Sequence, residues 1–175
     1  MRYNFIIYFM VFLTTVTVAG CTPLSEHVYK SPHNSSANYD VVQIPDFRKD
    51  ESPWVPYDST KIIPDMLYDK LLASKKFRLV ERDADPVKHG EKVLLVKGAV
   101  TDYDRGCKFC EWFFFGINDK GKSTTSVWVE LIDKSSGDIL TDFSLHGRAE
   151  DPGYGKSRYT RIVDAIAKNI NKVSK

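Results

Sequence analysis

Two cysteines, Cys107 and Cys110, have the spacing in this sequence that most suggests chemistry, because two residues separate them in the stretch CKFC. Thiols at this spacing act as a redox pair, supply half of a zinc site or close a short disulfide. A redox pair normally opens a helix, which lowers the thiol pKa, whereas this pair is followed by the aromatic stretch EWFFFG. A zinc site needs further ligands, and the four histidines are scattered along the chain. The choice among these chemistries therefore depends on the compartment of the protein.

The third cysteine, Cys21, ends a hydrophobic N-terminal run. Residues 5–19 are apolar or Thr, and Arg2 is the only charged residue before Glu26. This run is shorter than the ~20 apolar residues that a membrane-spanning helix needs. It fits the hydrophobic region of a secretory signal, with Arg2 as the charged region before it.

Small residues precede this cysteine in the stretch VAGC, which ends with Gly20 and Cys21 and resembles the lipobox of bacterial lipoproteins. The resemblance implies a signal peptide over residues 1–20, cleavage between Gly20 and Cys21, and a diacylglycerol on the Cys21 thiol. It also implies acylation of the new amine with a fatty acid such as palmitate. Thr22 stands where an Asp is associated with retention in the inner membrane. We therefore expect a lipid-anchored protein of the bacterial envelope, held in the outer membrane.

An exported protein meets an oxidising environment, which favours a disulfide between Cys107 and Cys110. Free or intermolecular thiols and a redox or metal centre are the alternatives. A loop this short gains only ~2 kcal/mol from the disulfide in the chain-entropy model.

Next to the cysteine pair is an unbroken run of large aromatic residues: Trp112, Phe113, Phe114 and Phe115. These side chains cannot all face one core in a strand, because alternate residues of a strand point to opposite faces. Exposed aromatic side chains often mark interfaces, so the run is a candidate partner-binding segment. The alternative is a strand or folded hairpin that is buried on both faces.

Catalytic patterns are weak in this sequence. The stretch GYGKS resembles the end of a phosphate-binding loop, but Glu150 stands where that motif requires its first glycine. No Ser-His-Asp arrangement is recognisable, and His146 on a predicted strand is expected at the surface. We therefore expect no enzyme, no cofactor, no metal and no bound nucleotide.

Composition bounds the organisation of the chain. It has 175 residues and a formal net charge of +2, which gives no electrostatic basis for binding nucleic acid. Residues 21–39 are rich in Ser, Asn, Pro and His and lack periodicity, which predicts a lipidated cysteine followed by a flexible tether. Such a tether would span roughly 25 Å as a random coil. Residues 40–175 have the length of a single domain.

Hydrophobic periodicity in that domain predicts a β-α-β-β-β-β-α order. Pro64 is expected near the first turn of the first helix, Gly98 marks a possible bulge, and Gly137 supplies a positive φ in a hairpin turn. The predicted helices begin near Asp58 or Ser59 and near Ser157. The predicted strands cover residues 40–47, 76–82, 92–104, 123–133 and 139–150, and the last helix covers 157–173. A strand-helix-strand unit followed by a meander predicts a two-layer α+β domain, with a mixed sheet and helices packed on one face.

This order of elements resembles that of a known group. The stretches VVQIPDF, LYDKLLASKKFRLVER, LLVKGAVTDYD and SVWVELIDKSSGDIL, with a lipobox before them and an amphipathic helix after them, carry the resemblance. They resemble bacterial lipoproteins of domain of unknown function 4410. More distantly they resemble the periplasmic domain shared by CsgG, LpoB and the N-terminal part of TolB. The resemblance implies an envelope binding or assembly module and assigns no site residues.

The function expected from the sequence is that of a lipid-anchored envelope protein that binds or helps to assemble another envelope component. Its partners would be the membrane, through the lipid, and another envelope protein. The alternative is an envelope thiol-redox or hydrolytic enzyme that uses the cysteine pair or a site not visible in the sequence.

Overall fold

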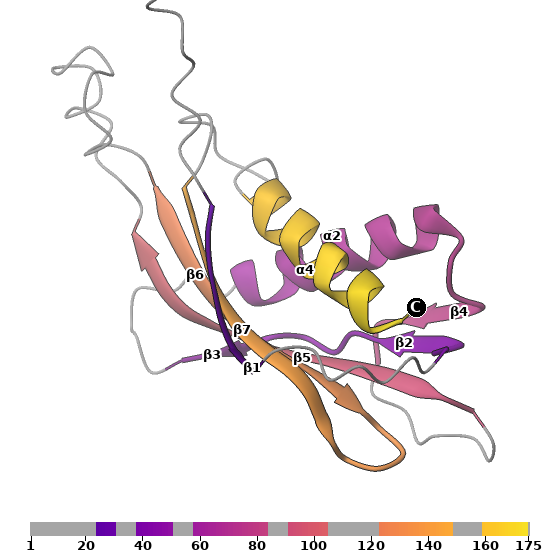
Figure 1. The fold of residues 1–175 in the computed structure, drawn as a ribbon. Coiled ribbons are helices and arrows are strands. Elements are labelled where there is room, and N and C mark those ends of the chain that lie inside the picture. Colours follow the sequence, from indigo (N-terminus) through magenta and orange to yellow (C-terminus); the bar gives the residue numbers. More distant parts are fainter. Residues whose placement is uncertain are drawn as a thin grey trace, which may run out of the picture.

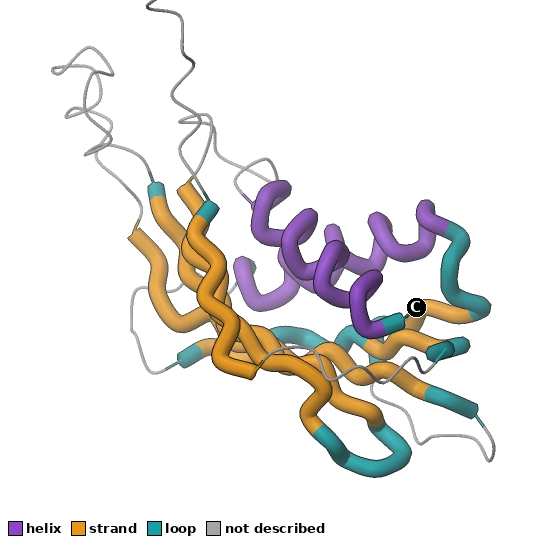
Figure 2. Tube along the Cα trace, viewed as in Figure 1, coloured by secondary structure: helices purple, strands orange, loops and turns teal. Residues whose placement is uncertain are grey.

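The computed structural model describes residues 24–30, 38–50, 58–83, 91–104, 123–148 and 159–174. These residues form one mixed sheet with two helices packed on one of its faces (Figures 1 and 2), which confirms the α+β class. The strands are β1 (Ser25–Lys30), β2 (Val41–Gln43), β3 (Arg48–Lys49), β4 (Leu79–Glu81), β5 (Val93–Asp104), β6 (Thr124–Asp133) and β7 (Ile139–Arg148). The helices are α2 (Ser59–Ser74) and α4 (Thr160–Val173).

The strands lie in the order β1-β7-β6-β5-β2-β4, and β3 pairs with β5 beside β2. Strands β5, β6 and β7 form the predicted antiparallel meander. Strand β2 is parallel to β4, as predicted for strands joined through a helix, and it is also parallel to β5. The long central strands thus carry most of the sheet, and short parallel strands complete one side.

The hydrophobic core lies between the sheet and the two helices. One face of β6 contributes Val127, Val129 and Leu131, as their alternation predicts, and all three are fully buried. The apolar stripe of α4, the helix expected to be amphipathic, is also buried. Its residues are Ile162, Val163, Ile166, Ala167 and Ile170.

Pro64 lies inside α2, in its second turn, and not in the first turn as expected. A proline here has no N–H to donate to the carbonyl of Thr60. That carbonyl instead accepts a hydrogen bond from the backbone N–H of Phe47, at 2.9 Å. The carbonyl that Pro64 leaves without a helical hydrogen bond thus links α2 to the residue that precedes β3.

Gly98 is not at the bulge of β5, which lies between Val100 and Asp102. Its role is steric, because a Cβ atom at Gly98 would come within 2.6 Å of the Phe47 ring. Phe47 is buried at 4% exposure and packs on this backbone. The glycine is therefore needed for close packing and not for a kink.

The β6–β7 hairpin turn is as predicted, with Gly137 at a φ of 79°. The Asp133 carboxylate organises it by accepting hydrogen bonds from the backbone N–H groups of Ser135 and Ser136 and from the Tyr39 hydroxyl. Burial raises the pKa of Asp133, but hydrogen bonds from Ser135, Ser136 and Tyr39 together lower it further than burial raises it. The net pKa lies below the ordinary value of 3.8.

The prediction of an unstructured tether over residues 22–39 is wrong for Ser25–Lys30, which form β1. This strand pairs with the edge of β7, and the Asn169 side-chain amide of α4 donates to the Glu26 carboxylate at 2.7 Å. Residues 25–29 of β1 are all exposed. Because none of them is buried, the strand has no alternation of apolar and polar residues from which it could be predicted. An edge strand of this kind is held by its backbone pairing and not by burial.

Three further boundaries differ from the prediction. The expected strand 40–47 divides into β2 and β3, and the expected strand 76–82 is reduced to β4. Helix α4 begins at Thr160 after Tyr159, and the predicted cap Ser157 lies outside the described residues. None of the helices in the described segments is long and apolar enough to cross a membrane.

Candidate functional site

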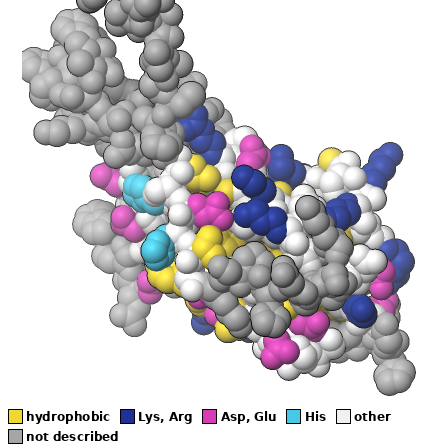
Figure 3. Space-filling view, in the orientation of Figure 1, with side chains coloured by type: hydrophobic (Ala, Val, Ile, Leu, Met, Phe, Trp, Pro, Cys, Tyr) yellow, Lys and Arg dark blue, Asp and Glu magenta, His cyan; other side chains and the backbone are white. Residues whose placement is uncertain are grey.

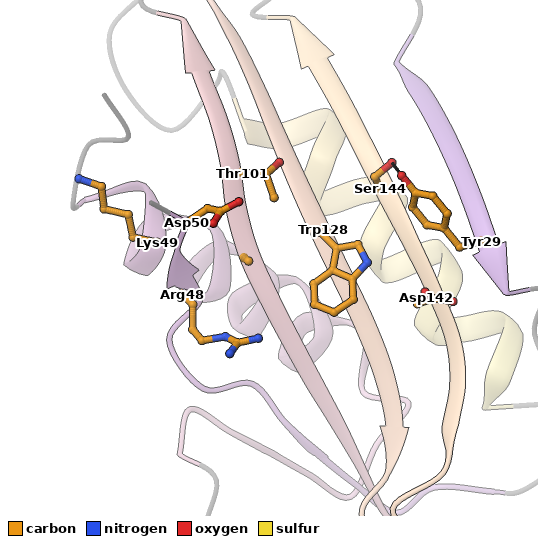
Figure 4. A pocket seen from close by; sticks show the side chains of 9 residues that line it. Tyr29, Arg48, Lys49, Asp50, Thr101, Trp128, Asp142 and Ser144 are labelled. Atoms are coloured by element: carbon orange, nitrogen blue, oxygen red, sulfur yellow. Dashed lines mark hydrogen bonds between the residues drawn. The ribbon is translucent and has the colours of Figure 1, made fainter. Parts of the chain in front are cut away.

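The face of the sheet opposite the helices carries a groove of about 660 Å³ (Figure 4). Its floor is formed by β5, β6 and β7, and its two walls by β3 and β1. The side chains that line it are Tyr29, Arg48, Lys49, Asp50, Ala99, Thr101, Trp128, Asp142 and Ser144.

The hollow exists because small residues flank a large one. Trp128 on β6 lies directly opposite Ala99 on β5 and Ser144 on β7. Cross-strand neighbours normally cover much of a large side chain on a sheet, but neither a methyl group nor a hydroxymethyl group can cover an indole. Trp128 is therefore only partly buried and forms the centre of the floor.

The indole N–H of Trp128 has no hydrogen-bond partner among the described residues. Figure 4 shows this nitrogen on the side of the ring that faces β7, where Ser144 and Asp142 lie. Indole N–H groups usually find a partner when they are buried. An unpaired one in a groove is a donor that a ligand can use.

The wall formed by β1 centres on Tyr29, which is 61% exposed. Its hydroxyl lies 3.4 Å from the Ser144 hydroxyl, and its ring makes an edge contact with the His27 ring at a centroid distance of 4.6 Å. These two contacts orient the Tyr29 side chain on the side of the groove formed by β1. The groove thus has two aromatic rings on either side of a hydroxyl group.

The opposite wall is charged. Arg48 and Lys49 of β3 lie on the rim next to Asp50, and the Asp142 carboxylate lies at the other side of the floor (Figure 4). A smaller hollow of about 330 Å³ adjoins the groove at Arg48 and includes Lys97 and Glu130. Charges of both signs are also interspersed over the surface seen in Figure 3. The site therefore combines an aromatic floor with charges of both signs.

The site residues predicted from the sequence lie outside the described residues. They are Gly20, Cys21, Cys107, Cys110, Trp112, Phe113, Phe114 and Phe115. Lipidation, the disulfide and aromatic partner binding therefore stay predictions. The sequence analysis in turn missed the groove, although Trp128 stands at an outward position between two core valines, Val127 and Val129. A tryptophan on the face that the alternation assigns to solvent was the available signal.

The described strands do fix where the predicted segments leave the fold. Ser25 lies opposite His146, and Asp104 lies opposite Thr124, so β1 and β6 begin at the same end of the sheet where β5 ends (Figure 1). Cys21 precedes Ser25 by four positions, and the aromatic run lies within the connection from β5 to β6. Both therefore join the described fold at one end.

His146 is exposed, as expected for a surface residue, and its Nδ1 lies 2.8 Å from the Ser126 hydroxyl. A serine and a histidine at hydrogen-bond distance are part of the arrangement of a nucleophile and its base. The pair is open to water and does not line the groove. Among the described residues, no three His, Cys, Asp or Glu side chains are grouped so that they could hold a metal ion.

No family model and no curated protein matches the chain, so the resemblance to domain of unknown function 4410 and to the CsgG, LpoB and TolB group is not confirmed. The solved PelC dodecamer from Paraburkholderia phytofirmans has a TM-score of 0.54 at 16% identity, over 87% of this chain and 96% of that one. A DUF330 protein from Xanthomonas campestris has a TM-score of 0.44 at 10% identity, over 82% of this chain and 88% of that one. Lipoprotein GNA1162 from Neisseria meningitidis has a TM-score of 0.41 at 15% identity, over 77% of this chain and 99% of that one. The similarity to PelC establishes a shared fold, and the two weaker similarities carry no argument.

Proposed function

We propose that this protein is a lipid-anchored component of the bacterial envelope whose domain binds another envelope component through the groove on the open face of the sheet. The observation that carries the proposal is the partly exposed Trp128 indole, whose N–H has no partner among the residues that the structure describes. Concave sites lined by aromatic rings and a few oriented polar groups are the usual form of a binding site.

The lipid anchor is supported by the lipobox resemblance at Cys21 and by the position of β1. Only residues 22–24 separate Cys21 from this strand. Four residue steps span at most ~14 Å, so an acylated Cys21 would hold the sheet close to the membrane. A role in assembly is supported by PelC, which shares the fold and is described as a dodecamer.

The proposal can be tested by photo-crosslinking in intact membranes. A photoreactive side chain placed at Thr101 or Ser144 in the full-length lipoprotein should form an adduct with one specific envelope component, because both positions line the groove. Leu72 is the matched control, since it is 52% exposed and lies on α2, in the helix layer. Equal adducts from Leu72, or none from the groove positions, would contradict the proposal.

A second variant separates binding from folding. Trp128→Ala should reduce crosslinking from Ser144 roughly tenfold or more, because aromatic anchors dominate interface energies. Trp112→Ala and Phe114→Ala test the predicted aromatic segment in the same assay. If these two variants lower crosslinking only in proportion to the folded fraction, the aromatic run belongs to the core and does not bind the partner.

A further inference from the structure

We propose that the groove binds a proline-rich segment in the polyproline II conformation, and that its occupant in this protein is residues 51–57 of a second copy. This inference rests on the proposed function, because it uses the same groove, and it names the partner.

The groove favours a ligand that is recognised through side chains. The floor strands β5, β6 and β7 are each paired on both sides, so they have no open edge to which an added strand can bind. Polyproline II segments have no internal hydrogen bonds and present their carbonyl groups to the surroundings. They dock in grooves lined by aromatic rings, into which their proline rings fit.

The side chains present match these needs. Tyr29 and Trp128 both line the groove, on either side of Ser144. The indole N–H of Trp128, which has no partner in the described part of the chain, is a donor for a carbonyl group of the segment. Small residues at Ala99 and Ser144 keep the floor open enough for a proline ring.

The chain itself contains such a segment. Residues 51–57 read ESPWVPY, in which Pro53 and Pro56 have the PxxP spacing, and no other pair among the eight prolines has it. The segment begins with Glu51 and is flanked by Asp50 and Asp58, so it has three acidic residues at its ends. The groove lining carries two cations, Arg48 and Lys49, beside two carboxylates, Asp50 and Asp142, so the acidic residues of the segment can pair with the cations of the β3 wall.

A second copy is the source of the segment that best fits the positions of its ends. Asp50 is fixed on the rim of the groove by a bond from its N–H to the Val100 carbonyl at 3.1 Å. Asp58 lies at the start of α2, in the layer on the other side of the sheet. The residues at the two ends of the segment, Asp50 and Asp58, thus lie on opposite faces of the sheet.

Groove and segment are different surfaces, so the contact is heterologous. Each copy gives its segment to one neighbour and receives a segment from another, which generates rings or open chains and not closed pairs. This arrangement predicts how variants behave when they are mixed.

The test uses the full-length lipoprotein purified from membranes in detergent, with its mass measured by sedimentation. The wild type should form assemblies larger than two copies. Trp128→Ala should lack a working groove, and the double variant Pro53→Ala, Pro56→Ala should lack a working segment, so each alone should be a single copy. Mixed together they should form pairs and nothing larger, because only one working contact is left. Pro32→Ala should assemble like the wild type.

A synthetic peptide of residues 50–58 provides a direct measurement. It should bind the double proline variant, and binding should fall roughly tenfold or more with Trp128→Ala. Trp128→Phe keeps an aromatic ring without the N–H and should bind the peptide at an intermediate level. This variant is the control for a folding defect, because a phenylalanine still fills part of the position of the indole. The same peptide with alanine at both proline positions should not bind.

Wild type that stays a single copy, variants that still assemble, or a mixture that forms no pairs would each overturn the inference. A peptide that binds while the wild type stays a single copy would mean that the segment occupies the groove of its own chain. If self-assembly fails but crosslinking from Ser144 to a different envelope component still depends on Trp128, the proposed function stands and this inference falls.

Discussion

At the scale of single residues, Phe47 packs on the backbone of β5 at Gly98, where an added Cβ atom would lie 2.6 Å from its ring. Phe47 also donates its N–H to Thr60, so it joins the start of α2 to β5. A change at Gly98 is therefore transmitted to the helix layer. It also reaches the groove, because β3 begins at the next residue after Phe47.

Gly98→Ala should lower the free energy of unfolding by about 1–3 kcal/mol, because the added methyl group would overlap the Phe47 ring. Urea denaturation measures this loss. The same substitution made together with Phe47→Leu should have a smaller effect, since the smaller side chain leaves space for the methyl group. An equal loss in both backgrounds would mean that Phe47 is not the group that requires glycine.

Asp133 gives the hairpin a defined pH dependence. Its folded-state pKa is below 3.8, so its ionised form stabilises the fold above the unfolded pKa, and this stability is lost as the pH falls through the folded pKa. Asp133→Asn should lower the free energy of unfolding by about 1 kcal/mol at pH 7. The difference from the wild type should shrink in acid. Asp138→Asn, an exposed position in the same turn, should show neither effect.

At the scale of elements, β1 is joined to the rest of the fold by its pairing with β7 and by the bond from Asn169 to Glu26. Asn169 is only 2% exposed. If the Glu26 carboxylate is removed, the nearly buried Asn169 amide loses one hydrogen-bond acceptor. Among the described residues, it then still donates to the Ala165 carbonyl.

Glu26→Ala should destabilise the pairing of β1 by about 1 kcal/mol, with little effect on the core. Hydrogen exchange should show faster exchange in β1 and in the β7 edge, while the β5–β6 pairing stays protected. Glu26→Gln keeps an acceptor oxygen and should exchange like the wild type. Global acceleration in Glu26→Ala would show that β1 is part of the cooperative core.

The sequence predicted those strands and helices that have one buried face, because a buried face requires apolar residues at regular intervals. The alternation of Val127, Val129 and Leu131 placed β6, and the three-and-four spacing of Val163, Ile166 and Ile170 placed α4. Strand β1 has no such pattern, because its register is set by backbone bonds to an edge that the sequence does not reveal. The groove was missed for a related reason, since its shape depends on which small residues lie opposite Trp128 across two strand pairs.

At the scale of the whole molecule, the domain has one open face and one end where the predicted anchor joins it. Cys21→Ser should abolish labelling with palmitate and release the protein from the membrane fraction, because a lipobox needs the cysteine thiol. The folded domain should be unchanged, which a thermal melt checks. A labelled and normally processed Cys21→Ser protein would rule out lipidation at this residue.

The position of β1 also determines how the domain responds to a mechanical load. A pull on the domain away from an acylated Cys21 would act on β1 along its own axis, starting at Ser25. The hydrogen bonds of an antiparallel pair are perpendicular to the strands, so the ladder with β7 is loaded in shear and its bonds resist together. A strand pulled across its axis would instead lose these bonds one at a time. Although β1 buries almost nothing, its pairing with β7 can thus hold the domain close to the membrane under load.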